Sequence, residues 1–217
     1  MSLLDDWLAY SPDLLHGLRA SLQLVAGSLI IGMPLGLLLA LGSSAKSKVV
    51  RTTIIVVVEI GRGTPALVML QLVYFGLPTA GLTFTAFISA TIALALTTGA
   101  YASEIIRGGL QAVPDGELEA AAALNMSRLD TLRYITIPQG MRVAIPSLMG
   151  LAILVFQATS LAYSIAVPEL LGAAYSLGSS TFQYLSVLSL AGLFYLVITI
   201  PASWLCERVE RRLARHL

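Results

Sequence analysis

The stretch "GELEAAAALNMSRLDTLRYITIPQ", residues 116–139, carries a tight cluster of charges in a chain that is 57% hydrophobic. Pro114 precedes it and can stand at or near the start of a helix, where its missing N–H has no partner to lose. Residues 116–124 are strong helix formers, and Glu117 and Glu119 fall in the first turn, where the helix dipole favours acids. The sequence therefore predicts a helix over 116–124.

The residues that follow predict a turn and a second helix. Asn125 should stop the first helix, because Asn is the non-glycine residue that best tolerates the left-handed conformation at helix ends. Ser127 follows as an N-cap, with Asp130 in the capping-box position. The second helix is expected over about 128–135, stopping before Pro138. Residues 116–139 thus predict a helix–turn–helix that stands outside a bilayer, and we call it the knob.

The rest of the chain has the composition of an integral membrane protein. The mean hydropathy is +0.84 and only 12% of the 217 residues are charged, against about 25% in soluble domains. The net charge of +1 indicates no nucleic-acid partner. The single cysteine, Cys206, excludes an intramolecular disulfide, and acids at Asp5, Asp6 and Asp13 argue against a cleavable signal peptide.

Five runs have the roughly 20 apolar residues that a spanning helix needs. The expected fold is therefore all-α, with about five transmembrane helices in a single domain. The spans are roughly 18–42, 53–76, 82–106, 143–167 and 182–206, with 107–142 as a loop and "GLPTAGL" (76–82) as a turn. Residues 168–181 predict a short outer helix or re-entrant piece. Residues 1–16 are amphipathic, and an interfacial segment and a frayed tail are both open.

The positions of lysine and arginine orient the spans. With 107–142 in the cytoplasm, eleven of the 13 basic residues lie inside, and only Arg19 and Arg62 lie elsewhere. The N-terminus is then outside and the C-terminus cytoplasmic. The eleven are Lys46, Lys48, Arg51, Arg107, Arg128, Arg133, Arg142, Arg208, Arg211, Arg212 and Arg215.

The knob is expected to expose small and apolar side chains, namely Ala120, Ala121, Leu124, Met126 and Leu129. Small residues would let the backbone of another protein approach closely. On spacing alone, an ordinary cytoplasmic loop stabilised by a helix is an equal alternative.

The spacing of Glu119-Ala120-Ala121, Asn125, Ile135 and Ile137-Pro138 resembles the "EAA…G…I-LP" signature of ABC importer permeases. Asn125 replaces the usual Gly and Ile137 the usual Leu. The stretches "GRGTPALVMLQLVYFGLP" (61–78), "GAYASEIIRGGLQAVPDGELEAA" (99–121) and "TSLAYSIAVPELL" (159–171) resemble the polar amino acid branch of that family. The resemblance covers nearly the whole chain.

The resemblance implies a subunit of a bacterial plasma-membrane importer. Its partners would be a second permease, identical or homologous, two ATPases that use ATP and Mg, and an extracytoplasmic substrate-binding protein. The knob would be the coupling helix seated on an ATPase, through Glu119, Ala120, Ala121, Leu124, Asn125 and Met126.

This chain is not expected to be an enzyme or to hold a cofactor of its own. The nearest stretch to a phosphate loop, "GSSAKS" (42–47), lacks the required glycines and spacing. His16 and His216 lie at opposite ends of the chain, so no metal site is expected.

Charges within spans are the best pointers to a transport path, because they are costly in hydrocarbon. Glu59 and Arg62 are three residues apart, as are Glu104 and Arg107, so each pair can meet on one helix face. The expected path residues are Arg62, Gln71, Thr97, Thr98, Tyr101, Glu104, Gln157, Thr159 and Ser160, with Glu104 meeting a substrate amino group. Local neutralisation of the charges, and packing by the serine and threonine side chains, are the alternatives.

Two departures from the family pattern bear on that path. Gln157 and Ala158 stand where the family often has Lys-Asp, and Thr97 stands where Asn is common. Whether this subunit holds the substrate itself is therefore open, as is a heterodimer in which it is the non-binding half. An importer of another small solute and a non-transporting scaffold for cytoplasmic partners are the alternative functions.

Overall fold

The computed structural model describes residues 3–213, and every regular element in that range is a helix or helical turn. Arg215 and His216, and the first two residues of the 1–16 segment, lie outside the described residues. The elements are α1 (Leu3–Gly42), α2 (Lys48–Gly63), α3 (Ala66–Gln71), η1 (Leu72–Gly76), η2 (Leu77–Ala80), α4 (Ala86–Gln111), α5 (Asp115–Ala123), α6 (Arg128–Thr131), η3 (Leu132–Thr136), α7 (Ile137–Ala158), η4 (Thr159–Ile165), α8 (Leu170–Thr181) and α9 (Tyr184–Leu213).

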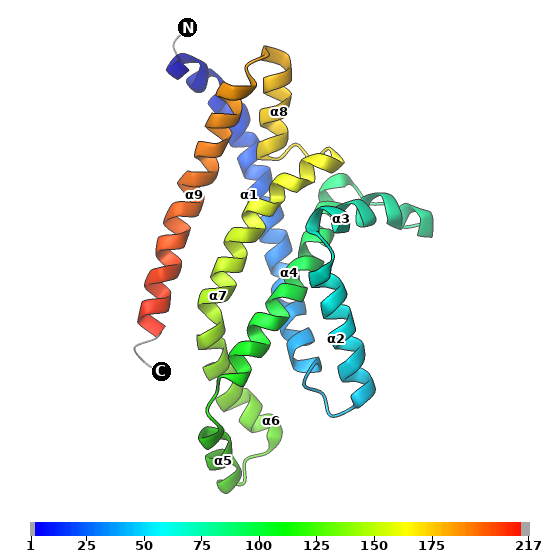
Figure 1. Ribbon diagram of the computed structural model, residues 1–217, viewed down its shortest axis with the longest axis vertical. Helices are drawn as coiled ribbons and strands as arrows, with labels where there is room; N and C mark the ends of the chain where they lie inside the picture. Colours follow the sequence, from blue (N-terminus) through cyan, green and yellow to red (C-terminus); the bar gives the residue numbers. More distant parts are fainter. Residues whose placement is uncertain (1–2, 214–217) are drawn as a thin grey trace.

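The described residues contain four helices long and apolar enough to cross a membrane, and a bent pair that makes a fifth if it counts as one span. The four are Asp6–Gly42, Ala86–Gln111, Arg128–Ile165 and Tyr184–Leu213. The expectation of an all-helical membrane protein with about five spans is confirmed. Figure 1 shows α8 and the start of α1 at one end of the molecule, and α5 and α6 at the other.

From Leu3 on, the 1–16 segment is the first part of α1, so the alternative of a frayed tail is wrong, and an interfacial position stays a prediction. Leu14 is fully buried there in a cluster with Leu170 of α8 and Val187 of α9. Pro12 lies inside the helix without ending it. Contacts with two later helices stabilise these turns, and local sequence did not predict those contacts.

Helix α4 lies at the centre, packed between α1 and α7 through small residues (Figure 1). Gly36 of α1 faces Ala102 so closely that an added methyl would lie 2.6 Å from its Cβ. Gly32 meets Thr98 in the same way, at 2.8 Å. The GxxxG spacing of these two glycines therefore serves packing within the chain, because the absence of a Cβ lets two backbones approach.

The second predicted span, 53–76, is not one straight helix. It breaks at Thr64-Pro65, and the two halves, Lys48–Gly63 and Ala66–Ala80, are bent by 102°. Thr64 is extended, with ψ 121, because a residue before proline is pushed out of the α region. Figure 1 shows α3 and the turns after it projecting sideways from the body.

The second helix of the knob continues through Pro138, so the expected stop before this proline is wrong. Residues Leu132–Thr136 form a π-helical turn, and Pro138 lies in the first turn of α7. An extra residue in the ladder is a known way to absorb a proline that has no N–H to donate. The second helix of the knob therefore joins α7 directly.

Gly109→Ala is expected to destabilise the crossing of α4 and α7. A Cβ at Gly109 would collide with the carbonyl oxygen of Gly140 and lie 2.9 Å from the Cβ of Ala144. Overpacking costs about 1–3 kcal/mol, so we expect the melting temperature in detergent to fall by roughly 5 °C. Gly108→Ala is the matched control, because nothing lies within 4 Å of its added Cβ. A control that melts as low as Gly109→Ala would contradict this account.

A buried glutamate joins α1, α8 and α9. Glu169 is fully buried and caps α8, accepting hydrogen bonds from the N–H groups of Leu171 and Gly172 at 3.0 and 2.8 Å. The hydroxyls of Ser21 in α1 and Tyr195 in α9 donate to the same carboxylate at 3.2 and 3.3 Å. Residues 168–181 thus contain the predicted short helix, fixed in place by one side chain.

Candidate functional site

The knob has the turn that the sequence predicts. Asn125 is left-handed, with φ 54. Its N–H donates to the carbonyl of Ala122, and the N–H of Met126 donates to that of Ala121, both at 3.0 Å. These two bonds form the Schellman pattern, which satisfies carbonyls at a helix end. The helix stop at Asn125 is confirmed.

The caps of the two knob helices agree with the sequence, with one shift. Pro114 is the N-cap residue of α5, and Asp115 and Glu117 lie in its first turn, so Glu119 is one turn further on than expected. Ser127 caps α6, accepting from the N–H of Asp130 at 3.2 Å, and its hydroxyl donates to the Asp130 carboxylate at 2.6 Å.

The knob exposes most of the side chains expected to face a partner. Leu124 is 76% exposed and Leu129 72%. Glu119 and Ala120 are also exposed, and Met126 is half-buried. Ala121 is only 1% exposed, so the expectation that it faces outward is wrong.

The first helix of the knob, α5, is tied to the start of α7. The side-chain amide of Gln139, in α7, donates to Glu117 of α5 at 3.4 Å. Figure 1 shows α5 and α6 at the end of the molecule, next to the ends of α4 and α7. A force on α5 would therefore reach α7 through both the backbone of η3 and this contact.

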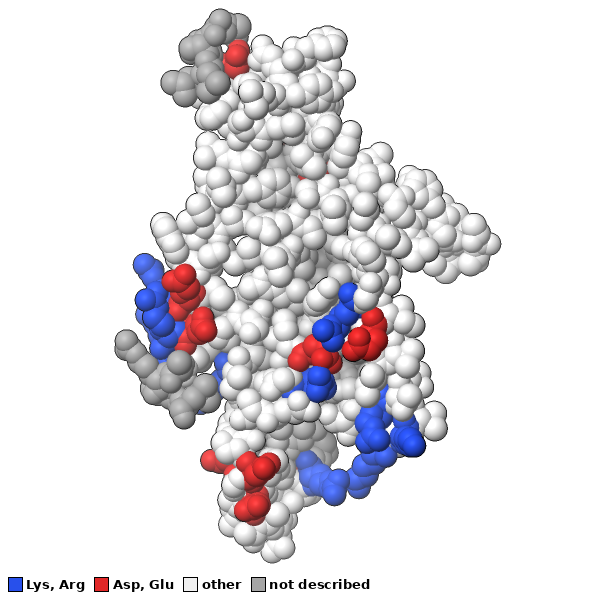
Figure 2. All heavy atoms as spheres, viewed as in Figure 1, with Lys and Arg blue, Asp and Glu red and all other residues white. Residues whose placement is uncertain are grey.

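Four charged side chains meet between α2 and α4, and we call them the ion cluster. Arg62 pairs with Glu59 at 3.5 Å and with Glu104 at 3.3 Å. Glu104 also accepts two bonds from Arg107, at 3.0 and 2.6 Å. The two i,i+3 pairs predicted from sequence are confirmed, and Arg62 joins them into one network. Figure 2 shows these acids and bases as a compact group on an otherwise uncharged part of this face.

A cavity of about 260 Å³ opens between α3, α4 and α7. Three of the predicted path residues line it, Thr97, Thr98 and Tyr101. Tyr101 also contacts the ion cluster, since its hydroxyl donates to the Arg62 carbonyl at 3.2 Å and its ring lies 6.0 Å from the guanidinium. Tyr101 thus links the cavity wall to the ion cluster, whose four members do not themselves line the cavity. The remaining lining residues are Ala66, Leu94, Leu151, Leu154, Val155 and Ala158.

Two buried polar atoms at this site have no hydrogen-bond partner within the described residues. They are the hydroxyl of Thr98, a residue that is 1% exposed, and Nε of Arg62. Buried donors are almost always paired, so an unpaired one calls for a specific explanation. Both atoms have almost no accessible surface, so a bound solute can pair with them only once the surrounding helices move apart.

Six predicted path residues do not line the cavity, and two of them, Arg62 and Glu104, belong to the ion cluster. Gln71 donates to Ser164 at 3.1 Å, and Thr159 and Ser160 donate to the carbonyls of Phe156 and Gln157 at 2.7 and 2.8 Å. Gln157 is exposed and is not among the cavity residues. Thr97 lines the cavity, but its hydroxyl already donates to the carbonyl of Ala93 at 3.1 Å.

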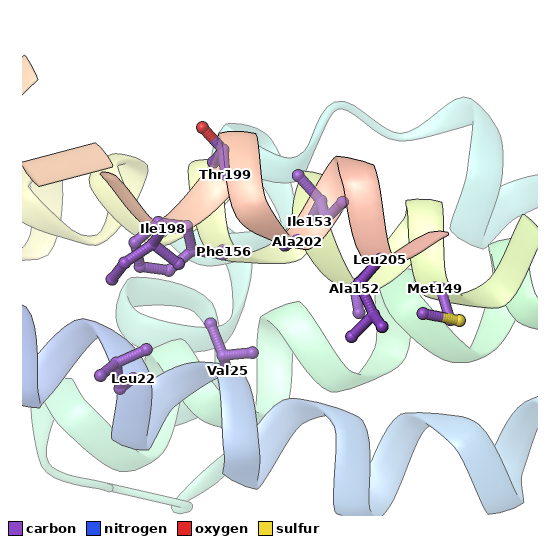
Figure 3. A pocket seen from close by; sticks show the side chains of 10 residues that line it. All are labelled: Leu22, Val25, Met149, Ala152, Ile153, Phe156, Ile198, Thr199, Ala202 and Leu205. Atoms are coloured by element: carbon purple, nitrogen blue, oxygen red, sulfur yellow. The ribbon is translucent and has the colours of Figure 1, made fainter. Parts of the chain in front are cut away.

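A second cavity of about 260 Å³ lies between α1, α7 and α9. Figure 3 shows its lining of aliphatic side chains with Phe156 and Thr199, and the Thr199 hydroxyl already donates to the Tyr195 carbonyl at 2.9 Å. Since it offers no free polar group to orient a solute, it is a weaker candidate site.

Sequence reasoning missed the apolar half of the first cavity. Leu151, Leu154 and Val155 have no feature that separates them from lipid-facing residues, because both settings select apolar side chains. The sequence did single out Thr98 as a path residue. That its hydroxyl lacks a hydrogen-bond partner could not be predicted, because this depends on the packing of α1 against α4.

Comparison with known proteins places the chain in a family. Residues 32–215 match the family described as "Binding-protein-dependent transport system inner membrane component". The chain is 36% identical to the L-cystine transport system permease protein TcyB of Bacillus subtilis, over 96% of this chain and 90% of that protein. It is 34% identical to the histidine/lysine/arginine/ornithine transport system permease protein HisM of Salmonella typhimurium, over 93% and 90%.

A solved structure agrees with these relatives. The chain superposes on a chain of an amino acid ABC transporter crystallised with histidines, with a TM-score of 0.91 and 33% identity, covering 98% of this chain and 99% of that one. Such binding-protein-dependent systems work with an ATPase and a binding protein, so ATP is used by the system rather than by this subunit. The chain thus belongs to the inner-membrane components of binding-protein-dependent transport systems, as the permease subunit of an ABC importer for amino acids.

Proposed function

We propose that this chain forms half of a translocation pathway in which the cavity and ion cluster hold the amino acid and the knob receives the movement of the ATPase. The other half is a second permease chain, identical or homologous, and each permease docks one of two ATPases, which hold ATP and Mg. The knob joins α4 to α7, the two helices that form most of the cavity wall, and its second helix runs on into α7. This arrangement supports mechanical coupling between the knob and the site.

The two unpaired donors are the observation that carries the substrate site. An amino acid carboxylate is an acceptor-only group. In a state of the importer that exposes these atoms, it would pair with the hydroxyl of Thr98 on the cavity wall or with Nε of Arg62 in the ion cluster. Glu104 is already engaged by two guanidinium groups. We therefore assign it the positioning of Arg62, in place of the direct contact to a substrate amino group expected from sequence.

The relatives indicate the class of solute. The printed name of one names L-cystine, and that of the other names histidine, lysine, arginine and ornithine. What these share is the α-amino and α-carboxyl pair of an amino acid, which matches an ion cluster made of two acids and two bases.

The proposed orientation has the knob in the cytoplasm, the N-terminus outside and α8 on the outer side, where a binding protein delivers the solute. Figure 2 supports it on the face shown, because the charged side chains gather in the half of the molecule that holds α5. The cytoplasmic loops of membrane proteins carry an excess of lysine and arginine.

Thr98→Val tests the substrate site. The change keeps the volume of the side chain but removes the unpaired hydroxyl, so we expect the KM for uptake to rise about tenfold, the worth of one hydrogen bond. The folded protein should be as stable as the wild type or slightly more so, since an unpaired buried donor is removed. Uptake is measured in proteoliposomes of the complete importer, with the amino acid that the wild type carries fastest.

Thr97→Val is the matched control for this test. Thr97 lines the same cavity but its hydroxyl is already bonded to Ala93, so its KM should change less than about twofold. An unchanged KM in Thr98→Val would exclude the hydroxyl from substrate binding and remove the proposed site.

A further inference from the structure

We infer that the cavity beside the ion cluster selects an amino acid whose side chain carries no charge. This inference rests on the proposed function and narrows its substrate class. It concerns the lining of the cavity rather than the ion cluster, and its first support is the size of the cavity. At about 260 Å³ the cavity is just below the range of about 300–1,000 Å³ for pockets that hold drug-sized ligands. It therefore suits one small molecule, not a peptide.

The charges at the site are already balanced. The ion cluster has two acids, Glu59 and Glu104, and two bases, Arg62 and Arg107, so its formal charge is zero. The α-amino and α-carboxyl groups of an amino acid also cancel. A substrate with an uncharged side chain enters without leaving any charge uncompensated, whereas a cationic side chain brings one charge too many.

The wall that the described residues of this chain contribute has no charged group that would compensate that charge. Six of its nine lining residues are aliphatic, and the other three are Thr97, Thr98 and Tyr101. Neither acid of the ion cluster lines the cavity, and Glu104 already holds Arg107 at 2.6 Å and Arg62 at 3.3 Å. A lysine or arginine side chain would have to shed water and bury its charge without a counter-ion, and that costs several kcal/mol. Burying the apolar methylene groups of a side chain against the same wall favours binding.

L-norleucine and L-lysine are the probes that isolate this effect, because the two differ only at the end of the side chain, a methyl against a charged aminomethyl group. Binding of each is measured by equilibrium dialysis on the purified permease–ATPase complex, with the binding protein omitted because it has a selectivity of its own. We expect norleucine to bind at least about 100-fold more tightly than lysine. Equal affinity for the two probes would overturn the inference.

Ala158→Asp provides the second measurement. Ala158 is a small residue of the cavity wall at the end of α7, so a carboxylate there supplies the missing counter-ion. Affinity for lysine should rise at least tenfold and that for norleucine should fall. Ala158→Asn is the control of the same shape without the charge, and it should not gain lysine binding. A gain as large in Ala158→Asn as in Ala158→Asp would overturn the inference.

These outcomes separate the selectivity from the proposed function. Equal binding of both probes to the wild type leaves the site in place and removes only the preference for an uncharged side chain. Binding of neither probe, together with an unchanged KM in Thr98→Val, removes the site itself.

Discussion

Replacing Leu124 by aspartate is expected to abolish substrate-stimulated ATP hydrolysis by the assembled importer, with a fall of at least about 100-fold. Leu124 is 76% exposed at the tip of the knob, beside the left-handed Asn125, and we propose that it is buried in a groove of the ATPase. The change removes the roughly 1.5–3 kcal/mol of apolar burial that a leucine provides, and it places an unpaired charge in the interface, which costs more. The ATPase should no longer co-purify with the permease.

Leu8→Asp is the matched control for this experiment. Leu8 is 74% exposed but lies near the start of α1, at the opposite end of the molecule from the knob (Figure 1). The control should retain the ATPase during purification. Normal co-purification and normal ATP hydrolysis in Leu124→Asp would show that the tip of the knob is not the docking site. Ala121 is avoided as a test residue because it is buried, so a charge there would disrupt the knob itself.

Glu169→Ala is expected to lower the free energy of unfolding by about 3 kcal/mol or more. The alanine removes a carboxylate that accepts from Leu171, Gly172, Ser21 and Tyr195. Each buried donor left without an acceptor costs about 1–3 kcal/mol. Thermal unfolding of the purified protein in detergent measures the effect. Ser180→Ala is a suitable control in the same helix, since its exposed hydroxyl bonds only the nearby carbonyl of Leu177. A melting temperature in Glu169→Ala equal to that of the control would contradict the role given to this side chain.

The same glutamate makes stability depend on pH. In the sequence, Glu169 lies after the span that ends at Ile165 and before the span that begins at Tyr184. Burial raises the pKa of its carboxyl above the ordinary value, and the four hydrogen bonds offset only part of that rise. The folded state therefore holds the proton more tightly than the unfolded state. This contribution to stability is complete below the unfolded pKa, about 4.5, and is lost as pH rises through the higher folded pKa. Glu169→Gln should remove that part of the pH dependence of the melting temperature, and an unchanged profile in this variant would show that another group is responsible.

The sequence alone determined the local features of this protein. Asn125, Ser127 and Pro114 each act on backbone groups within a few residues, so their roles in the knob were readable without the fold. The pairs Glu59–Arg62 and Glu104–Arg107 were predictable for the same reason, because helix geometry brings residues three apart together. The number of spans followed from the length and composition of apolar runs.

The tertiary structure alone decided which of these features meet. It joined the two charge pairs through Arg62 and turned Ala121 inward. It bent the second span at Pro65, carried the helix through Pro138, and placed Glu169 between three helices. The physical reason is that such contacts link residues far apart in sequence, and in a membrane protein the apolar side chains that pack a core resemble those that face lipid. Composition therefore gives the spans, and only their packing shows which faces enclose a cavity.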